Sequence, residues 1–276
     1  MKPFSFSKPG SLAKLMQARK DAAQFLAGGT NLVDLMKKNI AAPGALIDIS
    51  TALSDKVELT GGKLRIGAMV RNSAIATNAQ VISKAPLVAK AVLAGASPQI
   101  RNMASTGGNL LQRTRCPYFY DVSTPCNKRQ PGTGCSALHG ENRMSAIVGY
   151  NDQCVAVHPS DLCVALAALD ATVNVTNAQQ KQIVIPFKDF HKLPDNSPDR
   201  DNQLPANAII TSIDIPDNPF AQHHAYVKIR DRDSYAFALI SVAAALHIQG
   251  GRIADVRLAS GGVAHKPGAG TKQSSS

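Results

Sequence analysis

One long segment of this chain, residues 111–150, lacks the regular spacing of apolar residues that builds helices and strands. It is rich in aromatic residues, prolines and glycines, and it carries three of the five cysteines, Cys116, Cys126 and Cys135. Loops of this length in compact domains are usually functional or externally braced. We therefore expect something other than hydrophobic burial to hold this segment in place.

The rest of the chain has the composition of a folded protein. Of its 276 residues, 44% are hydrophobic and only 18% are charged, which excludes a disordered chain, a coiled coil or a collagen-like fibre. The length predicts about two domains. No apolar run reaches the roughly 18 residues of a membrane helix, and the start of the chain shows no export signal, so we expect neither.

The net charge of +11 admits a nucleic acid, an anionic membrane or an acidic protein as partner. The basic residues are scattered in ones and twos, tryptophan is absent, and aromatic residues make up 5% of the chain. Nucleic-acid binding usually requires clustered charge and stacking side chains. The sequence therefore disfavours nucleic acid and favours a phosphorylated cofactor or an acidic protein surface.

Hydrophobic periodicity and turn residues predict mixed helices and strands before residue 219. A glycine turn joins a strand at 23–26 to a helix that Asn31 is expected to cap. Two helices are expected within 72–96, followed by a glycine- and serine-rich loop over 95–109. The remaining predictions are a helix over 11–19, strands over 45–49, 61–68, 154–157 and 208–215, a helix beginning at 159–161, and a hairpin of strands 172–175 and 182–185.

A proline-rich turn at 216–219 predicts a domain boundary. Beyond it we expect antiparallel strands over 225–229, 238–248 and 253–260, without a covering helix. Sheets of two or three uncovered strands are marginally stable. Residues 268–276 have the composition of a linker.

Two glycine-bearing segments are candidates for holding phosphate groups. Ala27-Gly28-Gly29-Thr30-Asn31 lies between a predicted strand and helix, and Ala104-Ser105-Thr106-Gly107-Gly108-Asn109 offers consecutive amides and hydroxyls. Each alone is as consistent with a simple chain reversal as with a binding loop. Together they predict a clamp for the diphosphate of a dinucleotide.

The cysteine spacing matches no common zinc ribbon or ferredoxin motif. Disulfides, structural zinc, an iron-sulfur cluster and unligated thiols all remain open, although the odd cysteine count disfavours disulfides. Cys163 lies in an apolar helical run, where a free cysteine behaves as a small hydrophobic residue. The candidate ligands are therefore Cys116, Cys126, Cys135 and Cys154.

His158-Pro159-Ser160-Asp161 resembles a helix start more than a Ser/His/Asp catalytic site, because residues so close in sequence seldom adopt triad geometry. Asp161 could still touch a ligand from the first helical turn. Lys228 ends a predicted strand and could meet an anionic ligand between the domains. The other histidines lack metal-ligand spacing and are interpreted as surface or core residues, among them His139, His191, His223, His224 and His265.

In their order along the chain, these motifs resemble the FAD-binding subunits of the xanthine dehydrogenase family of molybdenum hydroxylases. The resemblance rests on Ala27 to Leu32, Ser105 to Asn109, His158 to Asp161, Lys228 to Ala238, and Gly261-Gly262-Val263-Ala264-His265-Lys266-Pro267. The segment with Arg113-Thr114-Arg115-Cys116-Pro117-Tyr118, Pro125-Cys126 and Gly134-Cys135 is similar to the flavoprotein subunits of periplasmic aldehyde oxidoreductases. The match extends to about Pro267.

The resemblance implies an α+β architecture. Residues 1–218 would form a PCMH-type FAD-binding fold of two subdomains, with a cluster-binding insertion at about 111–154. Residues 219–267 would form an incomplete C-terminal domain of the carbon monoxide dehydrogenase flavoprotein type, followed by a disordered tail at 268–276. Family members continue into helices that cover the last sheet, so the sheet at 225–260 is expected to have reduced stability here.

The resemblance also implies the cofactor residues. Cys116, Cys126, Cys135 and Cys154 would hold a [4Fe-4S] cluster, with no ligand role for Cys163. FAD would be bound by Phe25, Leu26, Ala27, Gly28, Gly29, Thr30, Asn31, Leu32, Ser105, Thr106, Gly107, Gly108, Asn109, Asp161 and Lys228.

The implied function is electron transfer. In a heterotrimer, an aldehyde would be oxidised on a molybdenum-cofactor large subunit, and electrons would pass through [2Fe-2S] clusters of a small subunit to FAD and a terminal acceptor. The location would be periplasmic if a partner carries the export signal, and otherwise cytoplasmic. The alternatives are a zinc- or disulfide-braced module without redox function, a self-sufficient flavin oxidase, and a truncated, inactive remnant.

Overall fold

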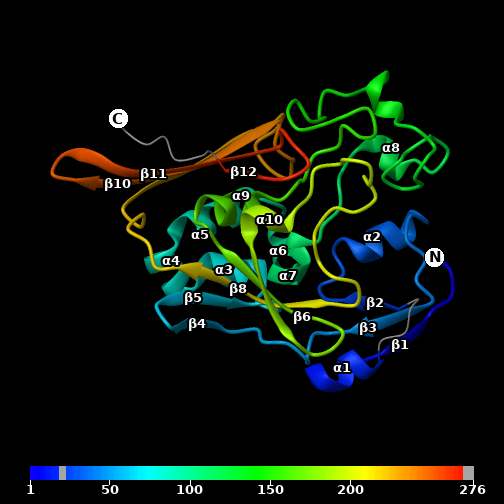
Figure 1. The fold of residues 1–276 in the computed structure, drawn as a ribbon, viewed down its shortest axis with the longest axis horizontal. Helices are drawn as coiled ribbons and strands as arrows, with labels where there is room; N and C mark the ends of the chain where they lie inside the picture. Colours follow the sequence, from blue (N-terminus) through cyan, green and yellow to red (C-terminus); the bar gives the residue numbers. More distant parts are fainter. Residues whose placement is uncertain (19–22, 270–276) are drawn as a thin grey trace.

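The computed structural model describes residues 1–18 and 23–269 of the chain. Three sheets surround a central group of short helices, and the cysteine-bearing insertion lies at one corner of the molecule (Figure 1). The chain is therefore α+β, as the sequence predicted. No helix in the described part is both long enough and apolar enough to cross a bilayer.

The N-terminal sheet is parallel, with the strand order β1-β3-β2. Parallel neighbours need a crossover between them, and two short helices supply the crossovers. Leu15 and Ile47 are buried in the small core of this unit. The elements are β1 (Ser5–Ser7), α1 (Leu12–Ala18), β2 (Ala23–Leu26), α2 (Leu32–Lys37) and β3 (Ala45–Asp48).

The second sheet has five antiparallel strands in the order β4-β5-β8-β6-β7. Gly61 and Gly62 turn its first hairpin with φ angles of 56° and 72°, which glycine adopts most readily. The hairpin expected around Asn177 is confirmed as β6 and β7. The elements are β4 (Val57–Thr60), β5 (Lys63–Gly67), β6 (Thr172–Thr176), β7 (Gln182–Pro186), α10 (Phe187–Phe190) and β8 (Ile209–Pro216).

The central helices are more numerous than the sequence predicted. Residues 72–94 form three helices rather than two, because Asn78 caps a new helix and Pro86 begins another. The expected loop over 95–109 is wrong: Ser97 and Ser105 each cap a short helix there. The helices are α3 (Asn72–Thr77), α4 (Ala79–Lys84), α5 (Pro86–Ala94), α6 (Pro98–Met103), α7 (Thr106–Leu110) and α9 (Asp161–Ala168).

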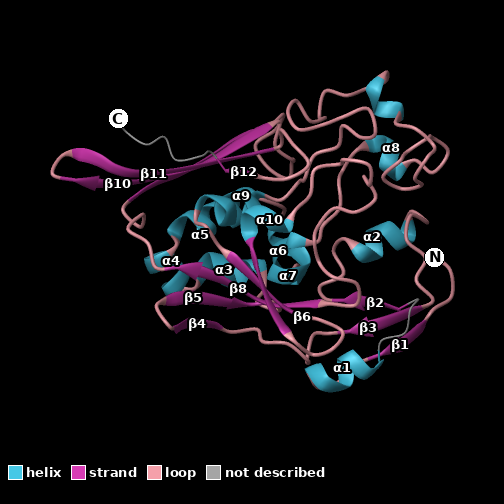
Figure 2. Cartoon of the chain, viewed as in Figure 1, coloured by secondary structure: helices cyan, strands magenta, loops and turns pink. Residues whose placement is uncertain are grey.

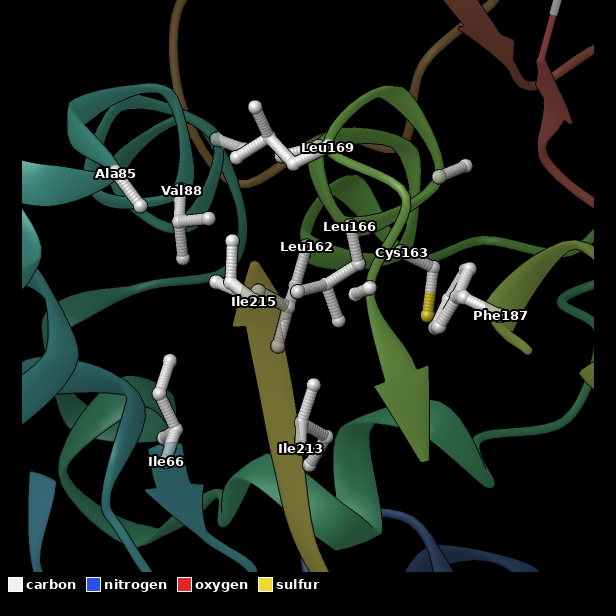
Figure 3. Packing of buried hydrophobic residues seen from close by; sticks show 14 of the residues in the cluster. Ile66, Ala85, Val88, Leu162, Cys163, Leu166, Leu169, Phe187, Ile213 and Ile215 are labelled. Atoms are coloured by element: carbon white, nitrogen blue, oxygen red, sulfur yellow. The ribbon is translucent and has the colours of Figure 1, made fainter. Parts of the chain in front are cut away.

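The main core lies between α5, α9 and the second sheet (Figure 3). Leu162 and Leu166 of α9 meet Ile213 and Ile215 of β8, and all four side chains are almost completely buried. Burying an aliphatic side chain of this size contributes roughly 1.5–3 kcal/mol. This helix therefore gains its stability from packing on both sides rather than from an amphipathic pattern.

The third sheet is antiparallel, with the order β12-β11-β10-β9. The expectation that its strands lack a covering helix is wrong, because α5 and α9 from earlier in the chain pack against it. Ala243, Ala245 and Ala259 face these helices and belong to the main core. The strands are β9 (His223–Ile229), β10 (Ile240–Gln249), β11 (Arg252–Gly261) and β12 (Gly268–Ala269).

The first two residues of the C-terminal tail, which the sequence predicted to be disordered, form a short strand instead. Gly268 and Ala269 pair with Ser260 and Ala259 as β12. Residues 270–276, the rest of that prediction, lie outside the described residues. The division into domains at 1–218 and 219–267 stays a prediction.

The insertion is built mainly of loops and turns (Figure 2), as its sequence indicated. It contains the helix α8 (Pro117–Tyr120) and a 3-10 helix, η1 (Ser136–Leu138). The strand expected at 154–157 does not form. The backbone here makes single hydrogen bonds to different parts of the chain. Val155 accepts a bond from the N–H of Ala146, and His158 donates one to the carbonyl of Ala264, so no continuous strand pairing forms.

Candidate cofactor site

A large cavity of about 1510 Å³ is lined by residues from α2, α5, α9 and the turn after β9. It exceeds the roughly 300–1,000 Å³ of typical small-ligand pockets, so a large ligand such as a dinucleotide would fit. Leu26 and Thr106 do not line it. The other expected FAD residues do: Phe25, Ala27, Gly28, Gly29, Thr30, Asn31, Leu32, Ser105, Gly107, Gly108, Asn109, Asp161 and Lys228.

One wall of the cavity is the loop at residues 28–32, called here the loop wall. Among the described residues, no hydrogen bond uses the backbone amides of this loop. Gly29 has a φ of 74°, and a methyl group on Gly28 would collide with the carbonyl of Met103. Glycine at both positions thus lets the loop turn sharply and approach α6, while its amides stay available to an anionic ligand.

Asn31 does not cap α2, contrary to the sequence prediction. Its backbone is already helical, and its side-chain Oδ1 instead accepts a hydrogen bond from the backbone N–H of Arg113 at 3.1 Å. Tertiary contact has replaced the local cap. Asn31 therefore joins the loop wall to the start of the insertion.

A second wall of the cavity, called here the paired wall, is built by residues 105–109, Asp161 and Lys228. Its amides are already used: Thr106 N–H donates to the carbonyl of Val70 and Gly107 N–H to that of Ala68, both at 2.9 Å. Ser105 Oγ accepts from Gly108 N–H at 3.3 Å. The expectation that residues 104–109 offer free consecutive amides is therefore wrong, because they are anchored as the N-terminal turn of α7.

Asp161 and Lys228 form a buried ion pair at this wall. Lys228 Nζ lies 2.8 Å from Asp161 Oδ2 and donates to the carbonyl of Ala94 at 3.1 Å. Their side chains are only 4% and 9% exposed. Tyr226 donates to Asp161 Oδ1 at 2.7 Å, and its own pKa is raised, first by burial and then by the carboxylate. The third N–H of Lys228 has no partner among the described residues and can serve a ligand.

The expected helix start at residues 159–161 is confirmed. Ser160 Oγ accepts from the backbone N–H of Cys163 at 3.1 Å and caps α9. Ser160 also donates to Asn109 Oδ1, which ties α9 to α7. These contacts explain Ser160 as a structural residue, in agreement with the rejection of a catalytic triad.

The sequence analysis missed several cationic and aromatic residues that line the cavity, including Arg113, Arg115, Arg232 and Phe237. Arg115 lies over the ring of Phe237 at 5.3 Å. These residues come from the insertion and from the turn after β9, where no local pattern distinguishes a lining residue from a surface one. The only available signal was the net positive charge.

The four candidate cysteines lie together around a second, small cavity in the insertion. Cys126 and Cys135 face each other in an antiparallel bridge. All five cysteines are free thiols, and Cys163 lies apart from this cavity in α9. The structure thus brings Cys116, Cys126, Cys135 and Cys154 from four separate positions of the chain to one place.

The thiols around the cysteine cavity differ in their pKa values, and burial raises the pKa of Cys116. A hydrogen bond from Cys154 lowers the pKa of Cys135 to about 6, while the corresponding bond and burial raise the pKa of Cys154. Lys128, whose side chain is 3% exposed, lies near Cys154 and favours its thiolate. Four thiols without disulfide partners are a donor set that fits a metal cluster or a metal ion.

Comparison with known proteins decides the family. Residues 2–218 match a family described as the FAD binding domain in molybdopterin dehydrogenase. The chain belongs to this family. It is also 47% identical, over 270 residues, to the aldehyde oxidoreductase FAD-binding subunit PaoB of Escherichia coli (strain K12), covering 97% of this chain and 83% of that protein.

Solved structures share the fold of this FAD-binding domain at lower identity. Quinoline 2-oxidoreductase from Pseudomonas putida 86 aligns with a TM-score of 0.71 and 22% identity, covering 97% of this chain and 77% of that one. CO dehydrogenase from Oligotropha carboxidovorans aligns with a TM-score of 0.72 and 21% identity, covering 98% and 79%. The expected family and fold are therefore confirmed.

FAD is the cofactor of this family, and the large cavity fits it in three respects. The loop wall offers amides that have no partner among the described residues, Arg113 and Arg115 line the cavity with guanidinium groups that are paired with Asp201 and Asp34, and one N–H of Lys228 has no partner in the same part of the chain. Amides and arginines together suit a diphosphate. The individual FAD-binding residues named from the sequence stay predictions.

Proposed function

We propose that this chain is the FAD-binding, electron-transferring subunit of an aldehyde oxidoreductase. The observation that carries the proposal is 47% identity to an aldehyde oxidoreductase FAD-binding subunit over nearly the whole chain. The nature of the large cavity agrees with it, because its residues bind and orient a ligand rather than form a general acid-base pair. When bound, FAD would accept electrons and pass them to a terminal acceptor.

The chain's own residues would act as a binding site in two parts. The amides of the loop wall would bind the diphosphate, and the guanidinium groups of Arg113 and Arg115, each already paired with an aspartate, would lie beside it as further hydrogen-bond donors. The paired wall would position the remainder of the cofactor, with the unused N–H of Lys228 as a hydrogen-bond donor. Since Asp161 already neutralises Lys228, this donor does not impose a net charge on the cofactor.

We further propose that the four clustered cysteines hold a [4Fe-4S] cluster. Convergence of four free thiols on one cavity supports this proposal. A cluster would also supply the bracing that the irregular insertion needs, because few of its residues are buried in a core of their own. A zinc ion in the same four thiolates is the alternative without a redox role.

The aldehyde itself would be oxidised elsewhere. We propose a heterotrimer in which a molybdenum-cofactor large subunit oxidises the aldehyde and a [2Fe-2S] small subunit carries electrons to this chain. The chain alone should therefore not reduce its flavin when aldehyde is added. A chain that turns over aldehyde without partners would instead be a self-sufficient flavin oxidase.

The test is an anaerobic visible spectrum of the purified chain, combined with FAD, iron, acid-labile sulfide and zinc analysis. We expect flavin bands, a broad absorbance that dithionite bleaches, and about four irons per chain. Cys126→Ser should lose the iron and keep FAD, whereas Cys163→Ser should keep both. Flavin with zinc in place of iron would refute the cluster alone, and a chain that cannot bind FAD would refute the proposed function.

A further inference from the structure

Three side chains that the proposed function does not use meet in the core beside α9. His158 follows the insertion, Cys163 lies in the first turn of α9, and His191 follows α10. One ring nitrogen of each histidine and the sulfur of Cys163 lie within 4.8 Å of one another. All three residues are buried, with relative exposures of 8%, 0% and 4%. Figure 3 shows the Cys163 sulfur beside the ring of Phe187.

Two ring nitrogens of this group have no hydrogen-bond partner among the described residues. His191 Nε2 lies 2.9 Å from the carbonyl oxygen of Leu110, and only a protonated nitrogen can donate to a carbonyl. The second nitrogen, Nδ1, therefore carries the lone pair, and it is buried without a hydrogen bond. His158 Nε2 is buried without a hydrogen bond as well. Buried polar atoms are rarely left unsatisfied, so two orphaned nitrogens beside one thiol point to an absent partner.

The two imidazoles lie side by side, with ring centroids 4.2 Å apart. Phe187 and Phe190 pack edge-on against His191, with centroids 5.5 and 4.9 Å away, and exclude polar alternatives on that side.

We propose that His158, His191 and Cys163 form a buried site for one thiophilic metal ion, Cu(I) or Zn(II). Two imidazoles and one thiolate are ligands that these ions share. Binding forms one metal-sulfur and two metal-nitrogen bonds and releases the thiol proton of Cys163 to solvent. No change of oxidation state is involved.

Charge favours Cu(I) over Zn(II) at this position. A thiolate neutralises Cu(I) completely, whereas Zn(II) would leave one positive charge buried among apolar side chains such as Phe187 and Phe190. Three ligands also complete the coordination that Cu(I) accepts, while structural zinc usually takes four.

The ion would join three parts of the chain: the end of the insertion, the start of α9 and the end of α10. It would be independent of the four-cysteine cavity, to which Cys163 does not contribute. Its expected effect is therefore on stability rather than on flavin or iron content.

The experiment uses the full chain expressed in medium supplemented with copper or with zinc, because a buried site must load during folding. Metal per chain is measured by mass spectrometry after dialysis against a weak chelator, together with FAD, iron and Tm. With added copper we expect one equivalent of copper per chain, and with added zinc we expect one equivalent of zinc. In each case we expect a higher Tm than for protein grown without the ion. In Cys163→Ser, which is nearly isosteric, we expect at least a tenfold lower content of that ion with unchanged FAD and iron.

Cys126→Ser is the matched control, since it should lose iron and retain the additional ion. Cys163→Ala provides a second variant in case serine disturbs the apolar helix. The proposal is overturned if the purified chain holds neither copper nor zinc, or if both Cys163 variants fold and retain the same metal content as the unaltered chain.

Discussion

The two walls of the large cavity contain similar residues but differ in how their polar groups are used. In the loop wall, consecutive amides have no partner within the described residues. In the paired wall, the corresponding amides bond to Val70, Ala68 and Ser105, and Asp161 is paired with Lys228. Glycine content alone therefore does not identify a binding loop. What matters is whether the chain has already satisfied the amides that the glycines expose.

This difference assigns the two walls different energetic roles. The paired wall is assembled before any ligand arrives, so its substitution should destabilise the ligand-free protein. The loop wall gains its hydrogen bonds only with a ligand, so its substitution should weaken FAD binding more than folding. The predictions below measure both quantities for each wall.

The largest effect is expected for Lys228→Met in the paired wall. This change leaves the carboxylate of Asp161 buried, with Tyr226 as its remaining donor. Breaking one partner of a buried ion pair costs about 3–5 kcal/mol. The free energy of unfolding of the FAD-free chain, from denaturant titration, should fall by that amount. The exposed neighbour Lys90 provides the control, since Lys90→Met should change it by less than about 0.5 kcal/mol.

If Lys228→Met left the FAD-free chain as stable as before, the paired wall would not be preassembled. The proposed contrast between the two walls would then fail at the ion pair of Asp161 and Lys228, where it is expected to be strongest.

The next effect is expected for Gly28→Ala, at the point where the walls approach each other. The added methyl group would collide with the backbone of Met103, so the loop must move away from α6. Overpacking of this kind costs about 1–3 kcal/mol. We expect that loss of stability together with loss of FAD, measured as FAD per chain after gel filtration. Gly10→Ala, at a glycine with no atom within 4 Å of the added carbon, should leave both quantities unchanged.

A smaller but more discriminating effect is expected from a pair of side-chain changes. Ser105→Ala removes the cap of α7 and should lower stability by about 1 kcal/mol, with little change in FAD affinity. Thr30→Ala in the loop wall removes a hydroxyl that makes no hydrogen bond within the described residues, so stability should be retained. FAD affinity, measured by fluorescence titration, should fall about threefold to tenfold in Thr30→Ala, within the range of one modest hydrogen bond. The reverse pattern would show that the two walls had been assigned the wrong roles.

The same contrast explains how much could be predicted from the sequence. The start of α9 and the hairpin of β6 and β7 were predicted because their signals are local: Ser160 caps its own helix, and Asn177 turns its own hairpin. Both loops were recognised as part of one site. Local patterns also predicted the strand and the helix that flank the first loop.

The errors lie where distant segments decide the structure. Residues 105–109 were expected to form a loop because of their glycines and serines, but the carbonyls of Val70 and Ala68 anchor Thr106 and Gly107 in the first turn of α7. The side chain of Asn31 accepts a hydrogen bond from the backbone of Arg113, 82 residues away, and does not cap α2. The third sheet appeared uncovered because its helices, α5 and α9, precede it by more than fifty residues. None of these partners can be read from a local window.

The last effect is a dependence on pH, and it concerns Arg113, which connects the loop wall to the rest of the molecule. Its backbone binds Asn31, and its side chain lies 2.7 Å from Asp201, which also pairs with Lys128. Burial raises the pKa of Asp201, but the charges of Lys128 and Arg113 outweigh burial and lower the pKa below its usual 3.8. Because the folded-state pKa is depressed, the contribution is complete above the unfolded value and is lost as the pH falls through the folded value.

Asp201→Asn should remove this contribution. The difference in unfolding free energy between the unaltered chain and Asp201→Asn should be constant above about pH 5 and shrink as the pH falls below the unfolded pKa of about 4. Denaturant titrations at several pH values measure it, with Asp199→Asn, at an exposed position two residues away, as the control. A difference that stays constant down to pH 2.5 would mean that Asp201 is not held ionised by its two cations. The loop wall would then be anchored through Asn31 and the backbone of Arg113 alone.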